Sequence, residues 1–305
     1  MNTNPIVILG STATGKSSLG IELAKDLNGE IVSLDAYQIY RGVDIASAKV
    51  KDFRGVAHHL IDIVDITYAM SVKEFQSRAR EAIAEIQARN RLPILVGGSA
   101  LYIQAVLFDF EFQATDRDVR SKLQDLADDI GSEALYQRLM DIDPDAAAHI
   151  AQGDTRRVIR ALEVNQITGS NYTPQLTDIE PAINHQKIGL SISPSTLRKR
   201  VIARVEQMFA EGLKDEVQRL HDQGFFQTPT AAKAIGYEDA WRLVQGEINQ
   251  ADAIASISNK TMTYAKKQMK WFKRDSSITW FDVEEVDFVT QVLSYVKSSL
   301  RTQEI

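Results

Sequence analysis

A glycine-rich segment that directly follows a short apolar run is the strongest constraint in this chain of 305 residues. The run Ile6–Leu9 leads into Gly10–Ser17, which reads Gly-Ser-Thr-Ala-Thr-Gly-Lys-Ser and fits the pattern G-x-x-x-x-G-K-[ST]. Between a strand and a helix, such a loop places backbone N–H groups around a phosphate anion. The segment therefore predicts a polyphosphate-binding loop, and an ordinary glycine-serine turn is the alternative interpretation.

Each position of this loop has a chemical reason. The glycines adopt backbone angles that let successive amides approach the anion, and Lys16 adds a positive charge. The Ser17 hydroxyl stands where Mg²⁺ is usually held, and the helix expected over Lys16–Leu27 directs its positive end at the phosphates. The predicted phosphate-binding residues are Gly10, Ser11, Thr12, Ala13, Thr14, Gly15, Lys16 and Ser17, and Ser17 is the predicted Mg²⁺ ligand.

Composition excludes several other classes of site. The chain has no cysteine, so disulfides, thiolate zinc sites and cysteine nucleophiles are excluded, and its five histidines argue against a histidine metal cage. A net charge of −6 argues against a wholly basic nucleic-acid-binding surface but allows a local basic face. We find no basic leader and no apolar run of membrane-spanning length, which predicts a cytoplasmic protein without membrane contact.

Strand-like runs alternate with helical patterns along much of the chain. A helix is expected over Val72–Arg89, and the alternation predicts an α/β fold built on a parallel sheet. The predicted strands are Ile6–Leu9, Glu30–Leu34, Ile94–Val96, Lys187–Ile192 and Ile278–Phe281.

A long stretch in the middle of the chain has helical spacing and no strand signal. Helical patterns occur at Val119–Ala127, Ser132–Met140 and Arg156–Thr168, which predicts a helical insertion domain. We place it at residues 116–182, within a core domain of residues 1–115 and 183–305. Later helices are expected over Thr196–Gln223, ending at Gly224, and over Gln250–Lys273.

Three predicted strands end in residues that could carry chemistry. Ligands of open α/β sheets bind beyond the carboxyl ends of the strands, so the phosphate loop, Asp35 and Gly97–Ser99 should converge. Asp35 could act as a general base or a ligand in the magnesium shell, and a helix or turn cap is the alternative. Ser99 could contact a phosphate oxygen or cap the next helix.

Two arginine clusters and one basic segment could contact phosphate groups. Arg156, Arg157 and Arg160 share one helical face, which is either solvated and salt-bridged or in contact with a phosphate backbone, while Arg200 or Arg204 could reach the phosphate site. Lys266–Arg274 holds five cations with Trp271 and Phe272 among them. This mixture is typical of nucleic-acid binding, and a basic helix end with core aromatics is the alternative. For His58-His59 a strand-edge or packing role is the default.

Taken in order, these segments resemble the tRNA dimethylallyltransferase family along the whole chain. The matching segments are Gly10–Ser17, Ser33–Ile45 leading to Ala48-Lys49, His58–Asp62, Gly97–Tyr102, Asp154–Val164, Ala234–Glu238 and Thr263–Gln268 with Trp271. The resemblance implies a P-loop NTPase-like core whose helical insertion grips a tRNA anticodon stem-loop. It also implies transfer of a dimethylallyl group from dimethylallyl diphosphate to the exocyclic amine of adenosine 37, with Mg²⁺ as cofactor and no obligate protein partner for a chain that could be a monomer.

The resemblance also assigns roles to individual residues. Asp35 would deprotonate or orient the adenine amine, Ser99 would contact the diphosphate near the scissile oxygen, and Arg204 would stabilise the departing pyrophosphate. The residues that would contact tRNA are Asp35, Ala36, Tyr37, Gln38, Ser99, Arg120, Arg156, Arg157, Val158, Ile159, Arg160, Gly236, Tyr237, Lys266, Lys267, Gln268, Lys270, Trp271 and Lys273.

The chain departs from the family pattern at a few positions. Ser99 and Ser47 replace the usual threonines and keep a hydroxyl, whereas Ala46 replaces a usual glycine. Met262 and Lys267 stand where arginines are common, and neither side chain reproduces a bidentate phosphate contact. Without cysteine, the chain cannot carry the zinc-finger extension of some eukaryotic relatives.

Three alternative functions use the same phosphate loop. A prenyltransferase acting on a free adenine nucleotide, or a small-molecule kinase, would have no use for the helical insertion and the basic-aromatic segment. A non-catalytic nucleotide-binding regulator would have no use for a carboxylate and a hydroxyl directed at one phosphate site.

Overall fold

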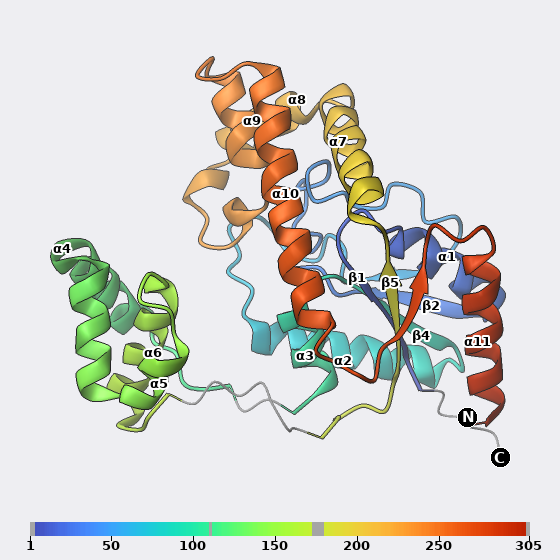
Figure 1. The fold of residues 1–305 in the computed structure, drawn as a ribbon, viewed down its shortest axis with the longest axis horizontal. Coiled ribbons are helices and arrows are strands. Elements are labelled where there is room, and N and C mark those ends of the chain that lie inside the picture. The colour runs from blue at the N-terminus through green and yellow to red at the C-terminus, as the bar shows by residue number, and fades with distance from the viewer. Residues whose placement is uncertain (1–3, 110–111, 173–179, 303–305) are drawn as a thin grey trace. The chain divides into compact units, whose positions relative to one another are not determined.

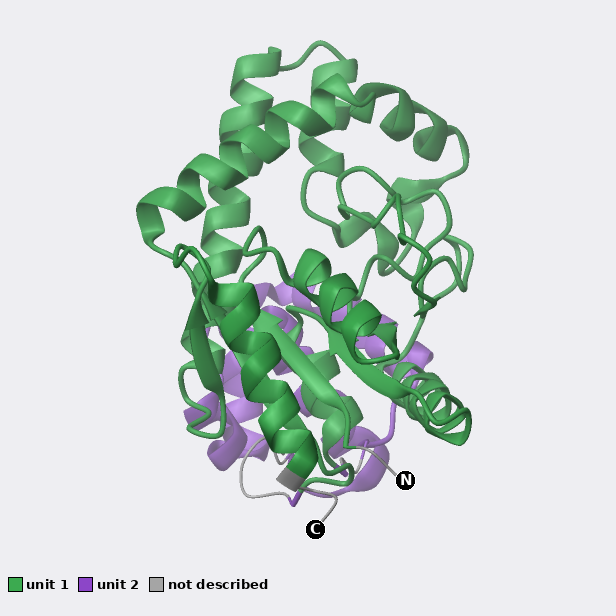
Figure 2. Cartoon of the chain, turned by 90° about the vertical axis from the view of Figure 1, so that its right-hand side faces the viewer, with its two compact units in different colours: residues 1–108, 181–305 green, residues 109–180 purple. Residues whose placement is uncertain are grey.

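The computed structural model describes residues 4–109, 112–172 and 180–302. The chain divides into two compact units, residues 1–108 with 181–305 and residues 109–180 (Figure 2). We call these the core and the insertion. The sequence-based boundaries lay at residues 116 and 182, so the division lies seven residues earlier on the amino-terminal side and two residues earlier on the other.

The core is built on a six-stranded parallel sheet with the order β3-β2-β4-β1-β5-β6. Figure 1 labels its strands β1, β2, β4 and β5. The prediction of a parallel α/β sheet is confirmed, with each of the five predicted strands present. The two-residue edge strand β3 was not among those five, but it confirms the strand-edge role expected for His58-His59. The bounds are β1 Ile6–Gly10, β2 Gly29–Ser33, β3 His58–His59, β4 Leu92–Val96, β5 Gln186–Ser191 and β6 Thr279–Asp282.

Alternate residues of β1 pack into different hydrophobic clusters on the two faces of the sheet. Val7 and Leu9 belong to a cluster with residues of α2 (Val72–Ala88), α7 (Pro194–Ala210) and α10 (Gln250–Phe272). Ile6 and Ile8 belong to a second cluster with residues of α1 (Lys16–Asp26) and α11 (Phe288–Thr302). Because side chains alternate across a strand, a fully apolar run such as β1 fits only a sheet that is covered on both faces.

The remaining core helices are shorter. They are α3 Ala100–Leu107, α8 Leu213–Asp222 and α9 Tyr237–Val244, with 3-10 turns at Phe225–Gln227 and Ala231–Lys233. The single helix predicted over Thr196–Gln223 is wrong, because the chain breaks between α7 and α8 at Gly212, whose φ of 98° lies in the left-handed region. Glycine adopts this conformation without steric cost, and it redirects the chain.

The insertion contains the helices α4 (Arg117–Ile142), α5 (Pro144–His149) and α6 (Thr155–Thr168) around its own hydrophobic cluster. The two helical patterns predicted at 119–127 and 132–140 both fall in α4, which is kinked at Gly131 (φ 83°). In the core, Phe108 and Pro181 form an isolated antiparallel bridge, so the chain leaves the core and returns to it at adjacent points. Among the described residues, no helix is long and apolar enough to cross a membrane.

Candidate active site

A pocket of about 360 Å³ lies at the carboxyl ends of the core strands. The phosphate loop after β1, Asp35 after β2 and Gly97–Gly98 after β4 all line it, so the predicted convergence of three strand ends is confirmed. Helices α7 and α10 contribute further side chains. The described residues that line the pocket are Thr12, Ala13, Gly15, Lys16, Ser17, Ser18, Ile31, Ser33, Asp35, Gln38, Ser47, Ala48, Val50, His58, Ile61, Val96, Gly97, Gly98, Arg200, Arg204, Tyr264 and Gln268.

The phosphate loop has the backbone of an anion-binding turn. Ala13 (φ 62°) and Gly15 (φ 95°) adopt left-handed conformations, and α1 begins at the next residue, Lys16. The N–H groups in the first turn of a helix have no intrahelical acceptor, so they are available to an anion in the pocket. For Gly10 the structure shows a packing reason, because a Cβ there would lie 2.9 Å from the Leu190 carbonyl oxygen.

Lys16 lies folded back over the loop, where its ammonium donates a hydrogen bond to the Ser11 carbonyl oxygen at 2.6 Å. Burial and the positive charge of Arg204 lower the pKa of Lys16 to about 7, while Asp35 opposes this shift. In the site without a ligand, the charged form of Lys16 is therefore destabilised. An incoming anion would supply the missing negative charge and restore the ammonium form.

Arg204 lies where its spacing on α7 predicted, in the wall of the pocket. Its Nη1 donates to the Thr12 hydroxyl at 3.2 Å, and burial lowers the pKa of its guanidinium while Asp35 opposes the shift. Within the described part of the chain, no carboxylate oxygen forms an ion pair within 4.0 Å of Lys16 or Arg204. Two cations thus converge on the phosphate loop without a paired carboxylate.

Asp35 combines both of the interpretations that its sequence position allowed. Its Oδ1 accepts hydrogen bonds from the backbone N–H groups of Tyr37 (2.8 Å) and Gln38 (3.2 Å), which makes it a turn cap. The same residue lines the pocket, and Oδ2 makes no hydrogen bond with another described residue. The turn therefore fixes the carboxylate through one oxygen and leaves the other available for a substrate amine.

The donor set also fits a magnesium ion that is bound together with a phosphate. The Ser17 hydroxyl and the Asp35 carboxylate are oxygen ligands of the kind that Mg²⁺ prefers, and both line the pocket. Among the described residues, no three His, Cys, Asp or Glu side chains are grouped closely enough to hold a metal ion by themselves. A metal at this position would therefore need oxygen ligands from the substrate.

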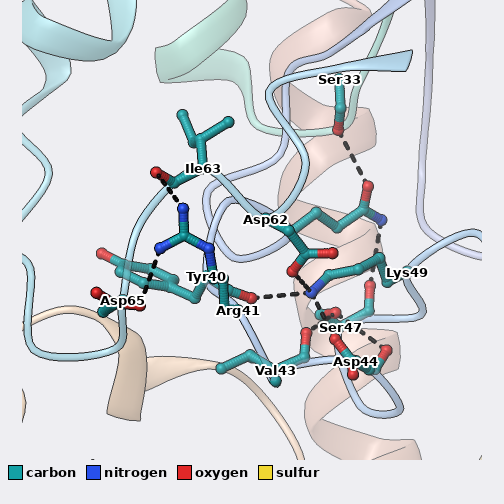
Figure 3. A network of polar contacts seen from close by, with 12 residues as sticks. Ser33, Tyr40, Arg41, Val43, Asp44, Ser47, Lys49, Asp62, Ile63 and Asp65 are labelled. Carbon is teal, nitrogen blue, oxygen red and sulfur yellow. Dashed lines mark hydrogen bonds and ion pairs between the residues drawn. The ribbon is translucent and has the colours of Figure 1, made fainter. Parts of the chain in front are cut away.

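A polar network holds the segment that follows Asp35 (Figure 3). Lys49, whose side chain is only 6% exposed, donates to the Tyr40 carbonyl oxygen and forms ion pairs with Asp44 and Asp62. Gln38, a predicted tRNA contact, accepts from the Ser33 hydroxyl at 3.0 Å. Lys49 and Asp62 were not predicted as site residues, although both stand in segments that match the family pattern.

Other predicted residues lie at the edge of this site or away from it. Ser17 lines the pocket, but Ser99 does not. Ser99 is half-buried at the start of α3, and its side chain does not cap that helix. Tyr264, one turn before Gln268 on α10, lines the pocket and was missed as a site residue, although it stands in a segment quoted for the resemblance.

The basic segment at the end of α10 divides into two faces. Its lysines are exposed and can meet a polyanion, whereas Phe272 lies in the core and Trp271 packs against the core. For Trp271 and Phe272, the alternative of core aromatics at a basic helix end is therefore confirmed. The exposed lysines are Lys266, Lys267, Lys270 and Lys273.

Tyr237 is fully buried, which is at odds with a direct contact between its side chain and RNA. Its hydroxyl donates to Glu216 at 2.6 Å, and Glu216 also accepts from the backbone N–H groups of Asp44 and Ile45. Burial raises the pKa of Glu216. Gly236 (φ 109°) directly precedes α9, which begins at Tyr237. Through Glu216, Tyr237 is therefore linked to the backbone of the segment that follows Asp35.

In the insertion, the predicted arginines are held in different ways. Arg120 and Arg160 both bind Glu163, whose side chain is fully buried, at 2.7 Å and 2.8 Å. Arg157 pairs with Asp154, and Arg156 is exposed without an ion pair to another described residue. The predicted contacts Val158 and Ile159 lie in the core of the insertion, so their side chains cannot face RNA as they stand.

A parallel sheet, a phosphate loop and two cations that form no ion pair with any described carboxylate define a P-loop protein with a helical insertion. A family model described as IPP transferase matches residues 38–275. The chain is also 43% identical over 303 residues to a tRNA dimethylallyltransferase of Nocardioides sp., covering 98% of both chains. The chain therefore belongs to the IPP transferase family, the tRNA dimethylallyltransferases.

Solved structures agree with this assignment. The full-length tRNA isopentenylpyrophosphate transferase from Bacillus halodurans is 38% identical, with a TM-score of 0.73, and the match covers 99% of this chain and 98% of that one. A eukaryotic dimethylallyltransferase acting on tRNA is 27% identical, with a TM-score of 0.81, and the match covers 99% of this chain and 80% of that one. The P-loop NTPase-like fold predicted from the sequence is thus confirmed.

Proposed function

We propose that this enzyme transfers a dimethylallyl group from dimethylallyl diphosphate to the exocyclic N6 amine of adenosine 37 in tRNA and releases pyrophosphate. The observation that carries the proposal is the pocket in which Asp35 and the cations Lys16 and Arg204 meet at the phosphate loop. In one pocket, a carboxylate can accept the proton of an amine nucleophile, and the phosphate loop can bind a diphosphate leaving group. The relatives named as tRNA dimethylallyltransferases support the same substrate pair.

In the proposed reaction, the N6 nitrogen attacks the allylic carbon of dimethylallyl diphosphate. A C–N bond forms and the C–O bond to the diphosphate breaks, so negative charge grows on the leaving oxygen. Asp35 accepts the proton that N6 loses, through the carboxylate oxygen that the turn leaves available. No ATP hydrolysis is needed, because the phosphate loop holds the leaving group.

The phosphate loop acts on the leaving group by electrostatics. The amides at the start of α1, the Lys16 ammonium and the Arg204 guanidinium are fixed before the charge develops, and preorganised donors of this kind are most effective in a transition state. Mg²⁺, held by Ser17 and the diphosphate oxygens, would neutralise part of the pyrophosphate charge. For Ser99, a contact with the diphosphate stays a prediction.

We propose that the RNA is bound by exposed cations of both units. Arg120, Arg156 and Arg157 on the insertion and the exposed lysines of α10 carry charges that can meet the phosphate backbone of an anticodon stem-loop. The adenine must be turned out of its stack to enter the pocket, which costs less in a loop than in a duplex. A cytoplasmic location and a monomeric state stay predictions from the sequence.

The proposal is tested by incubating the protein with radiolabelled dimethylallyl diphosphate, an anticodon stem-loop and Mg²⁺, without ATP. We expect label in the RNA, and none when adenosine 37 is replaced by guanosine. A parallel reaction with ATP and a small acceptor examines the kinase alternative. Phosphorylation of that acceptor without prenyl transfer to RNA would refute the proposal.

A further inference from the structure

Gln268 is a buried amide on α10 that joins two strand ends. The residue is 6% exposed, and both polar atoms of its side chain form hydrogen bonds. Nε2 donates to the Gly98 carbonyl oxygen at 2.8 Å, and Oε1 accepts from the Thr12 backbone N–H at 2.9 Å. The side chain therefore connects the segment after β4 with the phosphate loop after β1.

The glycine at position 98 is explained by this contact. A Cβ on Gly98 would lie 2.4 Å from Gln268 Nε2, and its next nearest atom would be the Gly10 carbonyl oxygen at 3.4 Å. The preceding Gly97 has a different reason, since a Cβ there would lie 2.7 Å from the Leu34 backbone oxygen. Of this glycine pair, only Gly98 makes room for the Gln268 amide.

Thr12 is held from two helices at once. Gln268 on α10 binds its backbone N–H, and Arg204 on α7 binds its hydroxyl. Thr12 precedes the first turn of α1, which begins at Lys16, so the glutamine fixes the loop without using the amides of that turn. An anion and Gln268 can therefore occupy their separate donors at the same time.

We propose that Gln268 is a positioning residue of the phosphate loop, which acts through Thr12 and Gly98, and that it does not contact RNA. An amide side chain suits this place because its terminal oxygen accepts a hydrogen bond while its terminal nitrogen donates one. The proposal rests on the proposed function only in taking diphosphate as the ligand of the loop. It replaces the expectation from family resemblance that Gln268 contacts tRNA.

The first test is Gln268→Met, which keeps the length of the side chain and removes both hydrogen bonds. We expect the affinity for pyrophosphate with Mg²⁺, measured by calorimetry, to fall about tenfold, while the affinity for the stem-loop stays within twofold. The matched control is Gln76→Met, because the Gln76 amide also holds a carbonyl oxygen, that of Ala105, but does not line the pocket. It should lower thermal stability without changing pyrophosphate affinity.

The second test is a double-mutant cycle with the glycine. Gly98→Ala alone should weaken pyrophosphate binding as Gln268→Ala does, because the new methyl group displaces the amide. In the Gln268→Ala background the clash is gone, so adding Gly98→Ala should change the affinity by less than twofold. Gly97→Ala, which meets backbone, is the control and should cost the same in both backgrounds.

Two results would overturn the proposal. One is a Gln268→Met protein that binds pyrophosphate as the wild type does, whatever happens to its RNA affinity. The other is full additivity of Gly98→Ala with Gln268→Ala. Failure of the proposed function looks different, because the wild-type protein would then transfer no label to RNA even if pyrophosphate binding still depended on Gln268.

Discussion

The pocket of the core and the arginine face of the insertion both bring two cations near one carboxylate, but they treat the charges in opposite ways. In the insertion, Glu163 is fully buried and contacts both Arg120 and Arg160 within 3 Å. In the core, the negative charge of Asp35 raises the pKa of both Lys16 and Arg204, but its hydrogen bonds come from backbone N–H groups.

This difference separates structural ion pairs from a binding site. The insertion pairs Arg120 and Arg160 with Glu163 internally, so these ion pairs stabilise the unit. The core keeps Lys16 and Arg204 without a paired carboxylate among the described residues, which leaves attraction for a ligand anion. An arginine cluster in a sequence does not reveal which case applies, because the partner can be far along the chain.

The largest effect is expected for Asp35→Asn. The amide oxygen can still cap the turn, but the proton acceptor is lost, so kcat for prenyl transfer should fall about 10³-fold. Pyrophosphate affinity should stay within about threefold, as measured by calorimetry. The control is Asp65→Asn, which removes an exposed carboxylate paired with Arg41 and should transfer normally. Full activity of Asp35→Asn would remove Asp35 from the base role.

The next effect compares one arginine from each region. Arg204→Met removes a cation placed at the leaving group and should lower kcat about 10²-fold at saturating RNA. Arg160→Met disrupts the Glu163 pair instead, so it should raise the KM for RNA and weaken the insertion while kcat changes little. Single-turnover rates separate the two outcomes. Equal losses of kcat in both variants would show that the contrast between the regions is wrong.

A smaller effect is expected for Glu163→Gln. Burial alone would raise the pKa of Glu163, but hydrogen bonds from Arg120, Arg160 and the Asp116 N–H outweigh it and lower the pKa. The carboxylate therefore stabilises the insertion above its unfolded-state pKa, and this stabilisation is lost as the pH falls through the lower folded-state value. We expect Glu163→Gln to lower the free energy of unfolding of the insertion by about 2 kcal/mol. This is less than for a fully buried ion pair, because water screens the half-exposed Arg120.

Hydrogen exchange of α4 and α6 measures this loss in the insertion separately from the core. The wild-type protection should decline with acidification, and Glu163→Gln should show a lower protection that no longer depends on this carboxylate. Unchanged protection in the variant at neutral pH would contradict a stabilising role.

The smallest effect is a pH dependence in the core. In the protein without a ligand, the pKa of Lys16 is about 7, so its neutral form dominates at higher pH. Binding of an anion then requires Lys16 to take up a proton. Pyrophosphate affinity should therefore weaken above pH 7, by up to about tenfold per pH unit. Calorimetry from pH 7 to 8 tests this, and Lys16→Met gives the pH dependence that belongs to pyrophosphate itself. The same slope in both proteins would exclude Lys16 as the titrating group.

The sheet and the phosphate loop could be predicted because local pattern determines them. Apolar runs, helical spacing and a glycine-rich turn are readable along the chain. The break at Gly212 was missed since Phe209, Leu213 and Val217 keep helical spacing across it. The partners of the polar side chains could not be predicted, because Glu163 and Gln268 look like surface residues in the sequence and only tertiary packing buries them.

The strand order has a consequence for protein synthesis. The central strand β1 pairs with β4 on one side and with β5 on the other, and β5 follows the insertion in the chain. A nascent chain on the ribosome therefore exposes one edge of β1 until Gln186 has emerged, and open edges of this kind invite aggregation or chaperone capture. The insertion, with its own cluster, can fold meanwhile. The pocket is complete only after α10, which supplies Tyr264 and Gln268 to its lining, has also left the exit tunnel.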